Sequence, residues 1–100
     1  MFVHAVYFWL RPDLTSKQRA QFAAGLESLR SIETVERGYV GAPAPTDRRV
    51  IERSYSQALV LVFADEAAHD AYQEHPVHDL FRNECSSFWT SVRIFDSIGT

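Results

Sequence analysis

The first segment of the chain, residues 2–10, restricts the fold more than any other part of the sequence. It is dense in β-branched and aromatic side chains and stops at a proline-containing turn, so we predict a β-strand. Successive side chains of a strand point to opposite faces, and both alternating sets here are apolar apart from His4. A strand of this kind has to be covered on both faces. We therefore expect helices against one face and a second protein layer against the other.

The next predicted elements are a helix and two strands. Residues 15–18, Thr-Ser-Lys-Gln, have the form of a capping box, and apolar side chains then recur at spacings of three and four up to Ile32. This pattern predicts a helix that ends near Ser31, with Gly25 allowing close packing against the sheet. Residues 34–41 and 55–63 are predicted strands, separated by a polar loop that contains prolines.

A proline divides the last part of the chain. Asp65 is suited to cap a short helix over residues 66–74. His75 precedes Pro76, and a residue before proline avoids the helical region, so we expect a break there. Pro76 can then open a second helix as its first residue, and residues 92–96 form the fourth predicted strand.

The predicted order is β-α-β-β-α-β, which is typical of the α+β, ferredoxin-like arrangement of a four-stranded antiparallel sheet with helices on one face. A chain of 100 residues fits one domain, residues 1–100. The other face of the sheet still has to be hidden. Because twofold dimers are the commonest soluble oligomers, we expect a homodimer in which two sheets face each other as a dimeric α+β barrel.

Charge and composition exclude several partners. The net charge is −3, with ten basic and thirteen acidic residues mixed along the chain, so no basic patch predicts nucleic-acid binding. The apolar start is about half the length of a membrane-spanning helix, and we expect no membrane partner. Cys85 is the single cysteine, which excludes an intramolecular disulfide and favours a cytoplasmic location. It lies on an apolar helical stripe and is predicted to be a core residue.

Several short motifs follow one another along the chain. They are His4-Ala5-Val6-Tyr7-Phe8, then Tyr55-Ser56-Gln57-Ala58-Leu59 with Phe63, then Tyr72-Gln73-Glu74-His75-Pro76-Val77-His78 with Trp89, and finally Ile94-Phe95-Asp96-Ser97. In this order they resemble one known family, the stress-responsive A/B barrel domain, and the likeness extends from about residue 2 to residue 97.

The resemblance implies a homodimeric α+β barrel, and most members of the family have no assigned reaction. One branch of the family, plant polyketide cyclases, folds a linear poly-β-ketone and closes it by aldol condensation without a cofactor. By this resemblance we expect no cofactor here. The catalytic tyrosine and histidine of that branch match Tyr72 and His78, and its first-strand histidine matches His4. Gln57 stands where those cyclases have another histidine.

The residue types at two of these positions also suit proton transfer. Neutral imidazole accepts a proton near pH 7, so His78 is a candidate general base for a carbon next to a ketone. Tyr72 is a candidate hydrogen-bond donor to the enolate oxygen that develops. The structural alternative is that Tyr72 packs against the sheet while His78 binds backbone carbonyls at the proline break.

Other residues are candidates for the walls of a binding site. His4 alternates onto the same face as Val6 and Phe8, where it is either a satisfied core group or a polar anchor in an apolar cavity. Phe81 and Trp89 are candidates for cavity wall or core.

Two histidines lie close enough in the sequence to raise the question of a metal site. His75 and His78 are three residues apart, but Pro76 breaks the helix that would align them, so we expect no metal. His69 is expected on the outward, solvent-exposed face of its helix.

The leading hypothesis is a small-molecule-binding dimeric barrel whose apolar cavity receives the polar tips of His4, Tyr72 and His78. Its enzymatic form is a cyclase or isomerase for an apolar or ketone-bearing ligand. One alternative is a non-catalytic stress or interaction protein whose cavity is filled by side chains. Another is a cofactor-independent oxygenase.

Overall fold

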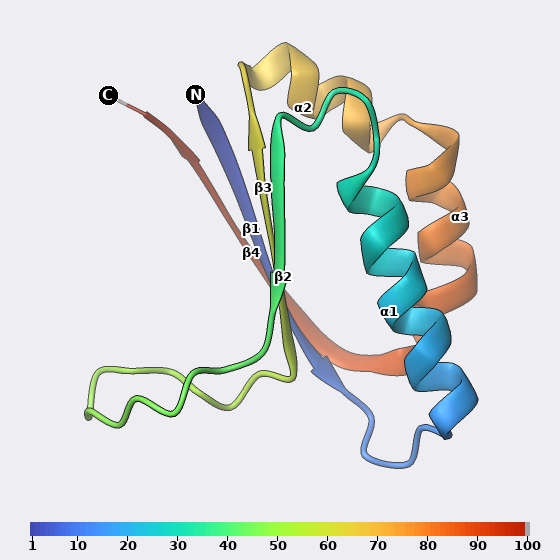
Figure 1. Ribbon diagram of the computed structural model, residues 1–100, viewed down its shortest axis with the longest axis vertical. Coiled ribbons are helices and arrows are strands. Elements are labelled where there is room, and N and C mark those ends of the chain that lie inside the picture. The colour runs from blue at the N-terminus through green and yellow to red at the C-terminus, as the bar shows by residue number, and fades with distance from the viewer. Residues whose placement is uncertain (100) are drawn as a thin grey trace.

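A single antiparallel sheet, with strand order β2-β3-β1-β4, forms one layer of the molecule and helices form the other (Figure 1). The computed structural model describes residues 1–99. The elements in chain order are β1 (Phe2–Leu10), α1 (Ser16–Arg30), β2 (Arg37–Gly41), β3 (Gln57–Phe63), α2 (Glu66–Gln73), α3 (Pro76–Cys85), a 3-10 turn (Ser86–Phe88) and β4 (Trp89–Ile98). The predicted ferredoxin-like fold is confirmed.

The helices begin where the sequence predicts. Thr15 Oγ1 accepts a hydrogen bond from the N–H of Gln18 at 3.1 Å, and Gln18 Oε1 accepts from the N–H of Thr15 at 2.9 Å, which completes the capping box. Asp65 Oδ1 accepts from the N–H of Ala68 at 2.9 Å at the start of α2. The break before Pro76 is also present, and that proline is the first residue of α3.

Three strands have boundaries that differ from the predicted ones. A turn in which Val35 N–H donates to the carbonyl of Ile32 at 2.9 Å delays β2 until Arg37. The third strand begins at Gln57 rather than at residue 55. The fourth strand is longer than predicted, because it pairs with β1 from Trp89 to Ile98. Polar residues near both ends of β4 interrupt the apolar pattern from which we predicted this strand.

The core lies between the helices and the inner face of the sheet, which is the face that the helices cover. Phe22, Leu26 and Leu29 of α1 are buried against the sheet. Gly25, expected to allow packing against the sheet, instead allows α3 to approach α1. A Cβ atom there would lie 2.7 Å from Cδ1 of Phe81. Cys85 is buried, as predicted.

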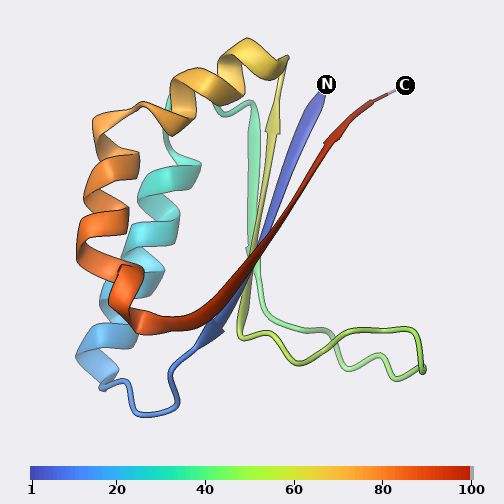
Figure 2. The same ribbon diagram turned by 180° about the vertical axis from the view of Figure 1, so that it is seen from behind.

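Within residues 1–99 no helix covers the outer face of the sheet, as the reverse view also shows (Figure 2). Val3, Ala5, Tyr7 and Trp9 of β1 lie on this face and are only half-buried. Tyr39 of β2 is 59% exposed and Phe95 of β4 is 57% exposed. The sheet is therefore apolar on both faces but covered on one. No helix within residues 1–99 has the length and apolar character that crossing a membrane requires.

Candidate functional site

A cavity of about 420 Å³ lies between the inner face of the sheet and the helices. All of the site residues predicted from the sequence line it, namely His4, Val6, Phe8, Tyr72, His78, Phe81 and Trp89. The sequence led us to expect a cavity of the barrel formed by two sheets. The cavity lies instead within one chain, because the His4 face of β1 is the face that the helices cover.

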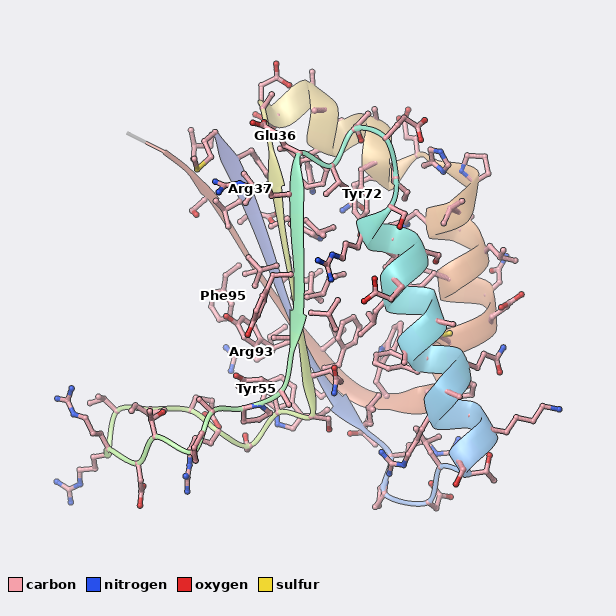
Figure 3. All side chains as sticks on the ribbon, in the orientation of Figure 1. Glu36, Arg37, Tyr55, Tyr72, Arg93 and Phe95 are labelled. Carbon is pink, nitrogen blue, oxygen red and sulfur yellow. The ribbon has the colours of Figure 1, made fainter. Side chains whose placement is uncertain are left out.

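Two local features bring the polar residues together. Strand alternation places His4 on the inner face of β1. The break between α2 and α3 then turns the chain so that the rings of Tyr72 and His78 meet edge to face, with centroids 5.0 Å apart. The centroid of the His4 ring lies 5.8 Å from that of Tyr72. Figure 3 shows Tyr72 between the sheet and the helices.

His78 has an unsatisfied ring nitrogen. Its Nδ1 atom is buried and has no hydrogen-bond partner, so the structural alternative of a bond from this atom to a backbone carbonyl does not hold. Burial lowers the pKa of His78 from its ordinary value of 6.5, and the positive charge of Arg82 lowers it further. The imidazole is therefore neutral at pH 7, which is the form that accepts a proton.

Tyr72 is among the most deeply buried side chains, with 1% of its surface exposed. Burial raises the pKa of Tyr72 well above its ordinary value. The phenol therefore keeps its proton and can act as a hydrogen-bond donor throughout the physiological range.

Asp96 is a member of the site region that the sequence did not single out for a role. In the register of the sheet Asp96 lies opposite His4, and its Oδ1 atom is 2.6 Å from Nδ1 of His4. Burial lowers the pKa of His4, and the hydrogen bond to Asp96 opposes that change. The carboxylate thus holds one ring nitrogen of His4 and leaves the other as an acceptor. Only the pairing of β4 with β1 could have revealed this contact.

His69 was expected to be exposed, and this prediction is wrong. Its exposed fraction is 9%, and its ring stacks on Phe2 with centroids 4.4 Å apart. The His4 ring lies 4.8 Å away. Ala68, His69 and Tyr72 lie on the side of α2 that faces the core, at sequence spacings of one, three and four. Because histidine is polar, the sequence pattern did not assign His69 to this buried side.

One group within residues 1–99 has the composition of a metal site. His4, His69 and Asp96 each offer a ligand atom, and these atoms lie within 4.8 Å of one another. A metal ion would have to displace the short His4–Asp96 hydrogen bond and would compete with the contact of 3.2 Å between His69 Nε2 and Gln73 Nε2. The arrangement of these three side chains therefore favours hydrogen bonds between polar atoms over coordination of a metal cation.

The His75–His78 pair is not arranged for a metal. His75 Nδ1 accepts a hydrogen bond from the N–H of Val77 at 3.1 Å, and its Nε2 atom lies 3.3 Å from Glu33. These contacts hold His75 at the start of α3, whereas His78 lines the cavity.

Further cavity residues come from all three helices, the 3-10 turn, β3 and β4. The polar members are Gln73, Arg82 and Ser86, and the apolar members include Val92 and Ile94. Arg82 follows His78 by four residues on the same helix, so a helical wheel drawn from His78 would have found it.

Comparison with known proteins places this geometry in a family. The family model of the stress responsive A/B barrel domain matches residues 2–98. No curated protein matches the chain.

Several solved structures have a similar fold. A dabb family protein with a ferredoxin-like fold from Mesorhizobium loti is 22% identical, with a TM-score of 0.79, 99% of this chain covered and 96% of that one. A dimeric ferredoxin-like protein of unknown function from Thermobifida fusca is 22% identical, with a TM-score of 0.76 and coverages of 96% and 88%. A hydroxynitrile lyase from Passiflora edulis is 18% identical, with a TM-score of 0.80 and coverages of 99% and 93%. At these identities the likeness is one of fold. Because the family model spans nearly the whole chain, the protein belongs to the stress-responsive A/B barrel domain family.

Proposed function

We propose that the protein is a homodimeric, cofactor-independent enzyme that removes a proton from a carbon next to a ketone, as a cyclase or an isomerase does. The observation that carries this proposal is the neutral imidazole of His78 beside the phenol of Tyr72, both in the lining of a cavity with mainly apolar walls. The pair supplies a base and a hydrogen-bond donor next to space for a substrate.

The proposed step is a simple proton transfer. His78 takes a proton from the α-carbon, the C–H bond breaks, and its electron pair moves to the carbonyl oxygen. Tyr72 donates a hydrogen bond to that oxygen as negative charge develops. The enolate carbon then either regains a proton from His78 on its opposite face, which inverts the configuration, or attacks a second carbonyl, whose oxygen takes the proton from His78. His4, held by Asp96, is a polar anchor for the substrate.

A cavity of about 420 Å³ supports ligand binding over the non-catalytic alternative, in which side chains fill this space. The fold also accommodates an enzyme in a solved neighbour, the hydroxynitrile lyase from Passiflora edulis. No residue of the cavity specifically favours an oxygenase.

The homodimer rests on the uncovered outer face of the sheet. Half-buried Tyr7 and Trp9 and the exposed Phe95 share this face, and a second copy would remove their apolar surface from water. Solved neighbours from Thermobifida fusca and from Jannaschia are described as dimeric. We expect sedimentation at micromolar concentration to give a dimer, and a stable monomer would contradict this part of the proposal.

The enzymatic proposal is tested by proton exchange. In D2O the α-protons of 4-phenyl-2-butanone should be replaced by deuterium faster with the protein than in buffer, as followed by proton NMR. His78→Ala should reduce the catalysed rate at least about 100-fold, the usual contribution of a general base, with little change in melting temperature.

The matched control is His75→Asn, which alters a histidine outside the cavity and keeps a side chain suited to cap α3. This variant should retain the exchange activity. If His78→Ala unfolds the protein, the histidine is structural. If the unaltered protein does not accelerate exchange, the catalytic role is wrong.

A further inference from the structure

Arg82 is the one permanently charged side chain in the lining of the cavity. The other lining residues are apolar or are His4, Tyr72, Gln73, His78 and Ser86, within the part of the chain that the structure describes. Arg82 belongs to α3 and lies one helical turn beyond His78. The positive charge of Arg82 acts on the imidazole of His78, since after burial it is the largest cause of the lowered pKa of His78.

The guanidinium of Arg82 has no acidic partner among residues 1–99. Arg11, Arg30 and Arg53 each lie within 4.0 Å of a carboxylate, whereas Arg82 is in none of the ion pairs of the described chain. Asp79 precedes Arg82 by three residues on α3, and the two side chains share a second hollow beside this helix.

We propose that Arg82 binds a carboxylate of the substrate, so that the protein acts on keto acids in preference to neutral ketones. This inference rests on the proposed function. A guanidinium presents a planar fork that matches a carboxylate with two parallel hydrogen bonds. Ser86, which shares a second hollow with Arg82, offers a further donor, while apolar residues such as Phe81 and Trp89 line other parts of the cavity.

The spacing between His78 and Arg82 on α3 limits the distance between the reacting carbon of the substrate and its carboxylate. Side chains four apart on a helix have Cβ atoms about 5–6 Å apart. A carboxylate bound by Arg82 therefore lies only a few bonds from the carbon that faces His78. A bound anion also offsets the positive charge that Arg82 directs at the imidazole, which makes His78 a stronger base when the correct substrate is present.

The test compares 4-oxo-4-phenylbutanoate with its methyl ester, which differs mainly in the charge. Titration calorimetry should give about fivefold tighter binding of the acid, a modest factor because Arg82 is exposed to solvent. Arg82→Gln should remove this preference and leave the affinity for the ester unchanged. Arg82→Lys keeps the charge and should retain part of the preference, and added salt should reduce it in the unaltered protein.

Equal affinities of the unaltered protein for acid and ester would overturn the assignment, as would an equal loss of both in Arg82→Gln. Deuterium exchange of the ester by the same samples separates the two proposals. Exchange of the ester that depends on His78, without a preference for the acid, leaves the enzymatic proposal standing and rejects the role of Arg82. A preference for the acid that depends on Arg82, without any exchange, retains the anion site and rejects the catalytic role.

Discussion

Both faces of the sheet carry apolar side chains, but the two faces differ in how their polar groups are placed. On the inner face His4 is 3% exposed and is hydrogen-bonded to Asp96. On the outer face the polar groups stay near solvent, as Arg93 does, with its guanidinium carbon 5.8 Å from the centre of the Phe95 ring. Figure 3 shows Arg93, Phe95 and Tyr55 on the side opposite the helices. Strand β1 contributes to both faces through simple alternation.

Each face also has a hollow, and the two are of similar size. The inner cavity measures about 420 Å³, and the outer hollow, about 450 Å³, is lined by aromatic residues together with Glu52 and Arg93. Only the inner cavity contains histidines whose pKa is lowered by burial. Volume therefore does not identify the chemical site, whereas the burial of titratable groups does. The aromatic lining of the outer hollow fits the dimer interface proposed above.

Among the changes that distinguish the two faces, removal of the Tyr72 hydroxyl group is expected to have the largest effect on the exchange rate. Tyr72→Phe should reduce the rate of α-proton exchange by about 100-fold or more, because a donor to a developing oxyanion contributes on that scale. Exchange is measured by NMR as above. Tyr55→Phe, the matched change at the outer hollow, should leave the rate unaltered. Equal effects of the two substitutions would remove the distinction between the faces.

A charge in the middle of the outer face should prevent dimerisation. Val60 pairs with Ala5 and Tyr39 in the sheet and points away from the helices. Val60→Glu should weaken association by about 100-fold, since an unpaired charge would be buried between two sheets. Sedimentation equilibrium measures the change. Leu80→Glu places the same charge on the exposed helical surface and should leave the dimer intact, and loss of the dimer in both variants would locate the interface elsewhere.

Asp96 is expected to position His4 rather than to contact the substrate. Asp96→Asn removes the carboxylate that opposes the lowering of the pKa of His4, so this pKa should fall further. The exchange rate should fall by about tenfold, as is usual when a partner that orients a histidine is lost. Imidazole NMR follows the pKa. A lower rate with an unchanged His4 pKa would mean that Asp96 acts by another route.

The smallest expected effect is the dependence of stability on pH. The folded-state pKa values of His4 and His78 lie below the ordinary 6.5, so the unfolded chain binds more protons once the pH falls below that value. The free energy of unfolding should therefore decrease on acidification from about pH 7 towards pH 5. His78→Gln should flatten this dependence in urea titrations. A stability that increases on acidification would contradict the direction assigned to both groups.

Much of the fold could be predicted because its signals are local. The capping residues Thr15 and Asp65 and the break at Pro76 act within a few residues of themselves, and each is found where the pattern placed it. The placement of His4, Tyr72 and His78 on one cavity followed from strand alternation together with the family resemblance.

The contacts that the sequence did not predict depend on the relative placement of elements. Asp96 meets His4 through the register of β4 against β1, which no local pattern determines. The burial of His69 depends on the rotation of α2 about its axis, because Phe2 and His4 receive a ring that a polarity pattern assigns to solvent. The location of the cavity within one chain likewise depends on which face of β1 the helices cover.

We assign substrate binding to the inner face of the sheet and dimerisation to the outer face. A crystal structure of the protein with 4-oxo-4-phenylbutanoate bound tests this assignment most directly. We expect the ketone beside Tyr72 and His78, the carboxylate at Arg82, and a second copy of the chain against Tyr7 and Trp9. A ligand bound in the outer hollow instead, or an outer face left open to water, would contradict the account.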